Sequence, residues 1–153
     1  MELMQRKIST KIGPLYLVAS STGLHGVYWH EQEYDFGESQ ILKTAQLQIE
    51  EFLEGKRRIF DIPLDIIGTK FQKQVWNQLE KIPYGETRSY KDIATAVNNI
   101  KACRAVGTAN GKNPLSILVP CHRVISSDGS LGGYAGGLEI KEKLLALEQG
   151  ASL

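Results

Sequence analysis

The hydrophobic pattern of this chain changes near Gly68, and the change limits the folds that the chain can adopt. Before Gly68, short extended runs separated by turn residues surround one helical segment, whereas after it helical spacing dominates. The 153 residues are 42% hydrophobic, which is enough for one packed core or two small subdomains. We therefore expect an α+β fold with an N-terminal α/β subdomain over residues 1–68 and a mainly helical C-terminal domain over residues 69–153.

The N-terminal part contains three β-like pieces between residues 6 and 30, separated by turns that contain glycine or proline. This layout predicts an antiparallel β-meander. Residues 39–54 carry apolar side chains on one helical stripe, and Gly55 is placed to end that helix. We expect residues 57–66 to return as an extended strand and connector.

The C-terminal part contains strong helix-start signals, such as Thr69 followed three residues later by Gln72, which together form a capping box. The predicted helices run from Thr69 to about Ile82, from Ser89 to Val97, from about Lys101 to Ala109, and from Leu138 to Gln149. The two short helices in the middle are joined by a tight turn, which is the outline of a helix-turn-helix. Helix pairs are common and most bind nothing, so this pattern alone leaves nucleic-acid binding open.

Charge is unevenly distributed along the chain. Residues 1–68 hold seven basic and ten acidic side chains, residues 69–112 hold eight and three, and residues 113–153 hold three and four. The basic middle segment is what a polyanion-binding surface requires. Lysines on solvated helix faces would give the same count, so both interpretations stand at this point.

Composition excludes several classes of protein. No run approaches eighteen apolar residues, and the first ten residues lack the layout of a secretory signal. We therefore expect a cytoplasmic protein with no membrane partner. The two cysteines, Cys103 and Cys121, cannot by themselves form a disulfide framework or a zinc site.

The strongest candidate for chemistry is Cys121, in the motif PCHRV at residues 120–124. We expect the apolar residues 115–119 to form a buried strand that places Cys121 near a cavity. A thiol becomes a nucleophile only when a base or a cation favours its thiolate, and His122 and Arg123 are candidates. Because neighbouring residues of an extended chain point apart, a bridging water can be needed. The alternative is an inert buried thiol.

Glu148 breaks a local rule. It lies on the apolar stripe of the last predicted helix, in the final turn, where the helix dipole disfavours an anion. Such breaks occur at functional sites, and a buried carboxylate would need a donor such as His122. A frayed helix end with Glu148 in water is the other interpretation. A carboxylate, an imidazole and a thiol also occur together in cysteine hydrolases, so this pattern does not name the reaction.

A set of short motifs follows a characteristic spacing from about residue 69 to residue 149. The motifs are Arg104-Ala105-Val106-Gly107, Asn113-Pro114, Pro120-Cys121-His122-Arg123-Val124, Gly133-Tyr134, Gly136-Gly137, Lys141, Leu144-Leu145 and Glu148. In these residues the chain resembles the C-terminal domain of the O6-alkylguanine-DNA alkyltransferases. Residues 1–68 resemble the variable N-terminal subdomain of that family only in layout.

The resemblance implies a direct-reversal repair reaction on double-stranded DNA that contains O6-alkylguanine. Cys121 would accept the alkyl group irreversibly and once per molecule, activated by Glu148 through His122 and a water. Asn113 would brace the active-site loop and link it to the second short helix. Tyr90 would hydrogen-bond the purine and supply a proton as the guanine leaves. No cofactor, metal or methyl donor is implied.

The resemblance also implies how DNA is held. Arg104 would fill the space left by a flipped nucleotide, from a helix that lies in the minor groove. The implied DNA-binding residues are Arg104, Ala105, Tyr90 and Arg123, and the implied substrate-pocket residues are Val124, Tyr134 and Ala135. At Ala135 many relatives carry serine, but a contact made by the backbone N–H would be preserved.

Some residues receive no role in this scheme. We interpret Cys103 as a packing residue and His25 and His30 as ordinary surface or core histidines. Nothing in the sequence indicates an apolar interface, so we expect a monomer. Two alternatives remain: a Cys-His hydrolase that turns over and ignores DNA, and a lesion-binding module that transfers nothing.

Overall fold

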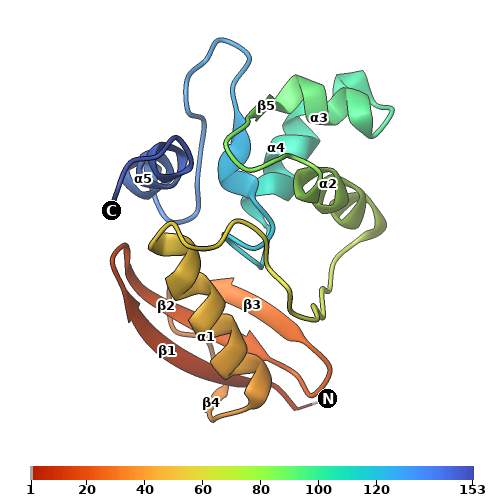
Figure 1. Ribbon diagram of the computed structural model, residues 1–153. Coiled ribbons are helices and arrows are strands. Elements are labelled where there is room, and N and C mark those ends of the chain that lie inside the picture. Colours follow the sequence, from red (N-terminus) through yellow and green to blue (C-terminus); the bar gives the residue numbers. More distant parts are fainter. Residues whose placement is uncertain (1) are drawn as a thin grey trace.

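A four-stranded sheet covered by one helix forms the N-terminal half of the protein in the computed structural model, which describes residues 2–153 (Figure 1). The elements are β1 (Met4–Thr10), β2 (Gly13–Ala19), β3 (Leu24–Tyr28), β4 (Asp35–Phe36) and α1 (Gln40–Leu53). The strand order is β3-β2-β1-β4, and β2 pairs antiparallel with both β1 and β3, so the predicted meander is confirmed. The short strand β4, which pairs parallel to β1, was not predicted.

Helix α1 packs on this sheet because its apolar residues recur at helical spacing. Leu42, Ile49 and Phe52 are fully buried on one face of the helix. Ser39 caps the start by accepting a hydrogen bond from the N–H of Leu42, and Gly55 takes a positive φ of 76° just after the helix. The helix predicted over residues 39–54 is confirmed.

The prediction of a strand within residues 57–66 is wrong. This segment makes a single parallel bridge, between Leu64 and Leu24, with hydrogen bonds from Leu24 N–H to Pro63 O and from Asp65 N–H to Leu24 O, both 2.8 Å. Pro63 has no N–H to donate, so the pairing does not extend into a ladder. The segment is a connector that follows the outer edge of β3.

The C-terminal half is mostly helical (Figure 1). Its elements are α2 (Lys70–Glu80), β5 (Arg88–Ser89), α3 (Tyr90–Ala96), η1 (Ile100–Ala102), α4 (Cys103–Gly111), η2 (Cys121–Arg123), β6 (Val124–Ile125) and α5 (Leu138–Glu148). Capping boxes are present at Thr69 and at Ser89, as the sequence predicts for the first. Helix α4 packs against α2 and α3, an arrangement consistent with a helix-turn-helix.

Residues 115–119 form tight turns and not the buried strand that we expected. Ile117 has a φ of 76°, which is unusual for a β-branched residue. The side chain of Asn113 closes the turn at both ends, because it accepts from Leu115 N–H at 3.0 Å and donates to Val119 O at 2.7 Å. Cys121 therefore begins the short 3₁₀ helix η2 and does not end a strand.

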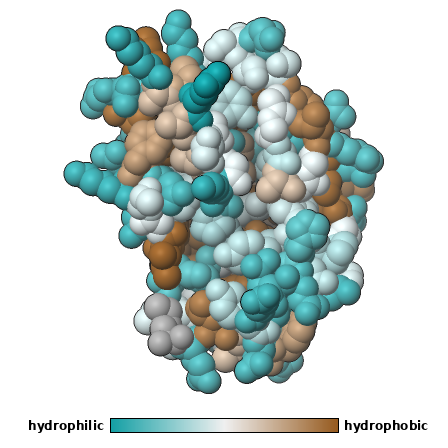
Figure 2. All heavy atoms as spheres, turned by 180° about the vertical axis from the view of Figure 1, so that it is seen from behind, coloured by the Kyte–Doolittle hydropathy of each residue, from teal (hydrophilic) through white to brown (hydrophobic). Residues whose placement is uncertain are grey.

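One hydrophobic cluster spans both halves, from Leu17 and Phe52 on one side to Val75 and Leu144 on the other. Strand β3 joins them directly, because Val27 N–H donates to Pro114 O at 2.8 Å. We propose a boundary between the two parts near Gly68. On the face shown in Figure 2, hydrophilic side chains cover most of the surface and apolar patches are small. No helix among residues 2–153 is long and apolar enough to span a bilayer.

Candidate active site

Cys121 lies where the two halves meet, at the start of η2, with only 4% of its surface exposed. Asn113 fixes the turn that precedes it, and Asn110 at the end of α4 donates to the carbonyl of Cys121 at 3.4 Å. The amide of Asn110 is a contact that the sequence did not indicate. The backbone at Cys121 is therefore held by the second short helix and by the turn that follows it.

His122 is completely buried and its Nε2 lies 2.6 Å from Oε2 of Glu148. Burial raises the pKa of Glu148, but hydrogen bonds from His122, Arg123 and the N–H of Gly85 outweigh it and bring the pKa to about 2. The carboxylate can then only accept, so the proton of the neutral imidazole must be on Nε2. Nδ1 is left as a lone pair, and within residues 2–153 it has no hydrogen-bond partner.

The remaining acceptor positions of Glu148 are also filled. Gly85 N–H donates to Oε1 at 2.9 Å, and Arg123 donates from Nε to Oε1 at 2.8 Å and from Nη2 to Oε2 at 3.0 Å. This set of donors offsets the cost of burying a carboxylate at a helix C-terminus. Glu148 is 7% exposed, so the interpretation that placed it in water at a frayed end is wrong.

Arg123 points inward, and its predicted contact with DNA needs correction. Its guanidinium binds Glu148 and the carbonyl of Ile82, and it lies against the ring of Tyr84 at 5.6 Å. Only 6% of Arg123 is exposed, because the neutralising pair with Glu148 is more favourable than leaving that carboxylate unpaired. Arg123 therefore supports the carboxylate and does not reach the protein surface.

The thiol itself is strongly protonated in this environment. Burial raises the pKa of Cys121 to about 11, although the Asn113 side chain and the nearby Lys141 ammonium act in the opposite direction. Burial also lowers the pKa of His122, against the opposing effect of Glu148. A protonated thiol close to a neutral imidazole needs a route for proton transfer before it can act as a nucleophile.

Lys141 lies beside the site, although it was not among the residues predicted to form it. Its ammonium group is fully buried and donates to the carbonyls of Val124 at 2.6 Å, Gly133 at 3.1 Å and Leu131. Burial lowers the pKa of Lys141 to about 8. A signal was available, because Lys141 shares the buried face of α5 with Glu148, seven residues later. The lysine ties α5 to the glycine-rich loop over residues 126–137.

Tyr90, at the start of α3, lies against the same loop. A Cβ on Gly132 would be 2.7 Å from its hydroxyl oxygen, so only glycine allows this approach. Burial raises the pKa of Tyr90, while the backbone N–H of Gly133 donates to its oxygen and lowers it. The structure therefore places Tyr90 against the glycine-rich loop, and its predicted contact with the purine stays a prediction.

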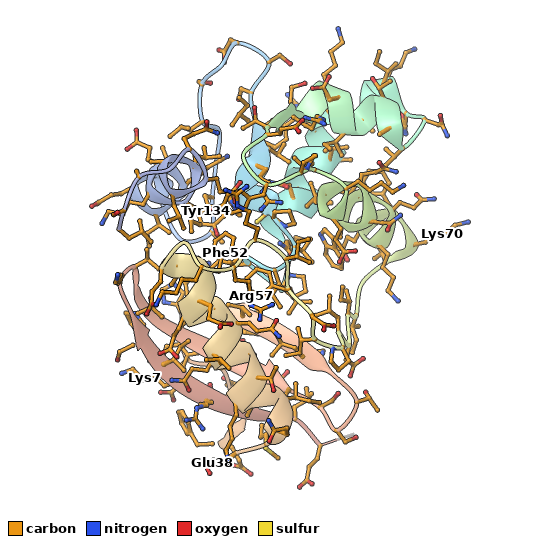
Figure 3. All side chains as sticks on the ribbon, in the orientation of Figure 1. Lys7, Glu38, Phe52, Arg57, Lys70 and Tyr134 are labelled. Carbon is orange, nitrogen blue, oxygen red and sulfur yellow. The ribbon has the colours of Figure 1, made fainter. Side chains whose placement is uncertain are left out.

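The three residues predicted to line a substrate pocket differ in exposure. Val124 is fully buried and its carbonyl accepts from Lys141, whereas Ala135 is exposed on the loop. Two aromatic rings lie near the imidazole of His122. The distance between ring centroids is 6.5 Å for Tyr134 and His122, and 6.4 Å for Phe52 and His122. Figure 3 shows Phe52 and Tyr134 at the junction of the two halves.

Arg104 and Ala105 are exposed on α4, whereas Val106 and Ala109 of the same helix are buried. They do not take part in the buried network around Glu148. Cys103 is half-buried and its thiol lies 3.7 Å from the carbonyl of Ile100.

The two N-terminal histidines are also accounted for. Nδ1 of His25 lies 3.0 Å from the carbonyl of Asp65, and His30 is exposed. Across residues 2–153, no group of three or more His, Cys, Asp or Glu side chains is arranged to hold a metal ion.

The fold and the site together define an α+β protein in which a buried thiol is next in sequence to an imidazole-carboxylate pair, within a mostly helical half that exposes Arg104 on α4. Family models identify the same class. Residues 70–150 match the DNA binding domain of 6-O-methylguanine DNA methyltransferase, and residues 3–66 match its ribonuclease-like domain. The chain belongs to the 6-O-methylguanine DNA methyltransferase family.

Individual relatives agree with this membership. The chain is 47% identical over 150 residues to the methylated-DNA--protein-cysteine methyltransferase of Methanosarcina acetivorans, covering 90% of this chain and 92% of the relative. It is 51% identical over 126 residues to the constitutive enzyme of Bacillus subtilis, covering 80% and 76%. The crystal structure of Mycobacterium tuberculosis OGT in complex with DNA superposes with a TM-score of 0.90 at 40% identity, covering 97% of this chain and 94% of that one.

Proposed function

We propose that this protein repairs double-stranded DNA by transferring an alkyl group from O6 of guanine to its own Cys121. The sulfur forms a bond to the alkyl carbon as the bond from that carbon to O6 breaks. The electron pair leaves with guanine as an anion, which a proton then neutralises. The product thioether is not hydrolysed by any group in the site, so each molecule acts once.

The observation that carries this proposal is the buried hydrogen bond between His122 and Glu148, next in sequence to the buried Cys121, whose pKa is raised to about 11. At neutral pH such a thiol is protonated and requires a base. The tautomer set by Glu148 leaves Nδ1 of His122 as that base, and a water would relay the proton from Cys121. Membership of the family supports the same assignment.

The other site residues fit this reaction. Tyr90 borders the glycine-rich loop from α3, where its hydroxyl would donate to the purine and deliver the neutralising proton. The backbone N–H at Ala135 and the carbonyl of Val124 would hold the base beside Tyr134. Asn113 would keep the turn before Cys121 in place through its two hydrogen bonds.

DNA would be bound by the exposed face of α4. The alkyl group on O6 lies inside the stacked duplex, so the nucleotide must be extruded, which costs a few kcal/mol. Arg104 would occupy the space that the nucleotide leaves, and Ala105 would allow a close approach to the backbone. We place the protein in the cytoplasm as a monomer that needs no cofactor.

Intact-mass measurement after mixing with an O6-methylguanine duplex tests the proposal. We expect a gain of one methylene, about 14 Da, with at most one transfer per protein. Cys121→Ala should bind the duplex and gain no mass, and Cys103→Ala should behave as the parent does. Sustained turnover would indicate a Cys-His hydrolase, and binding without a mass gain in the parent would indicate a lesion-binding module.

A further inference from the structure

Trp29 connects the N-terminal sheet to both segments that enclose the site. It follows the last residue of β3, and its indole N–H donates to the hydroxyl of Ser116 at 3.1 Å. Ser116 belongs to the tight turn before Cys121 and is 1% exposed. Because Val27 also bonds to Pro114, the end of β3 holds this turn by its backbone and by a side chain.

The same indole packs against the glycine-rich loop from the other side. A Cβ on Gly136 would lie 2.7 to 2.9 Å from three atoms of the Trp29 ring, which real side chains essentially never do. The φ of Gly136 is not among the positive values that require glycine. Glycine is therefore needed at position 136 because Trp29 lies against it, and not because of the backbone conformation.

Tyr134 is held between Trp29 and His122. Its ring meets Trp29 edge to face at 5.7 Å and meets His122 in the same manner at 6.5 Å. Such contacts stabilise an aromatic pair beyond what burial alone provides. No other aromatic ring of the described chain forms such a pair with Tyr134, so Trp29 is the outer support of this side chain.

We propose that Trp29 is a positioning and specificity-determining residue of the lesion pocket. It acts through Tyr134 and Gly136, by keeping the loop close enough to Cys121 to hold a small alkyl group. This inference rests on the proposed function, since it concerns the substrate of that reaction. The N-terminal half would thereby support one wall of the pocket, whereas DNA would be bound by α4 of the C-terminal half.

The test compares Trp29→Ala and Trp29→Phe with the parent in single-turnover transfer from O6-methylguanine and O6-benzylguanine duplexes. Without Trp29 the loop can move outward, and a displacement of about 1 Å can cost up to 10²-fold in rate. We expect Trp29→Ala to slow methyl transfer by about tenfold or more and benzyl transfer less, because the larger group fills the widened pocket itself. Trp29→Phe should recover most of the rate, because it keeps the edge-to-face contact.

Ile8→Ala is the matched control, because it removes a buried side chain from β1 of the same sheet. It should lower the melting temperature and leave the methyl-to-benzyl rate ratio as in the parent. If Trp29→Ala also lowers the melting temperature and leaves the methyl-to-benzyl rate ratio unchanged, Trp29 is only a structural residue and the inference is overturned.

A double-mutant cycle supplies a second readout. Gly136→Ala should slow transfer because the added methyl group clashes with the indole of Trp29. Trp29→Ala should relieve that clash. The effect of Gly136→Ala on the transfer rate should therefore be several-fold smaller in the Trp29→Ala background. Additive effects would overturn the inference. In all these experiments the parent must first transfer one alkyl group to Cys121. If it does not, the proposed function has failed and not the role of Trp29.

Discussion

The two halves of this protein bury different kinds of side chain. Among residues 2–68, the buried polar residues are the uncharged Gln5, Ser20 and Gln48. The C-terminal half buries His122, Arg123, Lys141 and Glu148, with partners that come almost entirely from that half.

Burying charge costs several kcal/mol per ion before pairing, so a set of ions like this is poor evidence of stabilisation. Its use is chemical: it sets the tautomer of His122 and the geometry of the loop around Cys121. On the proposed function, the first half would be a scaffold, whereas the second half would accept a cost in stability to prepare the Cys121 thiol. Variants in each half test that division.

The largest effect is expected from the relay. Glu148→Gln and His122→Ala should each slow transfer by roughly 10²–10⁴-fold, because positioned acid–base assistance is lost. Glu51→Gln in α1 is the matched change in the first half and should leave the rate unchanged. Rates are measured under conditions in which circular dichroism shows each variant folded. A similar loss in Glu51→Gln would show that the scaffold also takes part in the chemistry.

The pH dependence sharpens this test. In His122→Ala the reaction depends on free thiolate, so its rate should rise about tenfold per pH unit towards the Cys121 pKa of about 11. In the parent, the rate should fall only as the pH drops far enough to protonate His122, whose pKa is lowered by burial. Identical profiles would mean that something other than His122 removes the proton.

Arg104→Ala should slow repair of duplex DNA strongly, by about 10- to 100-fold, because the gap in the stack is no longer filled. Reaction with free O6-benzylguanine needs no extrusion and should be nearly unchanged. The ratio of the two rates is the measurement. Equal losses with both substrates would show that Arg104 supports the fold or the buried site and not the flipped state.

Tyr90→Phe should reduce the transfer rate by about tenfold with little change in DNA affinity, since only the proton for the leaving purine is lost. Single-turnover rates and duplex titrations with unmodified DNA separate the two effects. Parallel losses in rate and affinity would move Tyr90 from the chemistry to the binding surface.

Acid should weaken the buried network of the second half. The folded-state pKa of Glu148 is about 2, below its ordinary 4.5, so its contribution to stability is complete above pH 4.5 and is lost as the pH falls towards 2. Urea unfolding across this range should show a steeper loss of stability for the parent than for Glu148→Gln. Parallel curves would contradict the assigned pKa.

The smallest effect is expected from single lysines. Lys101→Ala or Lys112→Ala should weaken DNA binding regardless of sequence and lower the salt slope by about one unit if the lysine contacts a phosphate. Lys43→Ala in α1 is the control and should leave the slope unchanged. An equal change from Lys43→Ala would show that DNA contacts both halves of the protein.

Local elements of the fold could be predicted from the sequence because they depend on residues a few positions apart. Alternation of apolar and polar residues predicts the meander, and helical periodicity predicts α1. Capping residues, which bond to the residue three positions later, mark the starts of α2 and α3. The motif around Cys121 is equally local, and the family resemblance that it carries is confirmed.

Contacts between distant parts of the chain decided the rest. Residues 57–66 and 115–119 look like strands by composition, but each makes only a single bridge to β3. Pro63 interrupts the first pairing, and Asn113 turns the second segment. The sequence left open whether Glu148 lies in water, because its donors Gly85 and Arg123 are 63 and 25 residues away. The resemblance implied that Arg123 faces DNA, but its buried partners, Glu148 and the carbonyl of Ile82, are 25 and 41 residues away.

The local sequence of this protein thus determined its helices and its meander, and it indicated Cys121 as the proposed nucleophile. Only the tertiary structure decided which charges are buried together, how Lys141 and Trp29 hold the loop, and how strongly the thiol is protonated. Helical periodicity and capping depend on residues three or four positions apart, so the local sequence is enough to specify them. Burial and pKa depend on which segments exclude water from one another, and that arrangement exists only once the chain has folded.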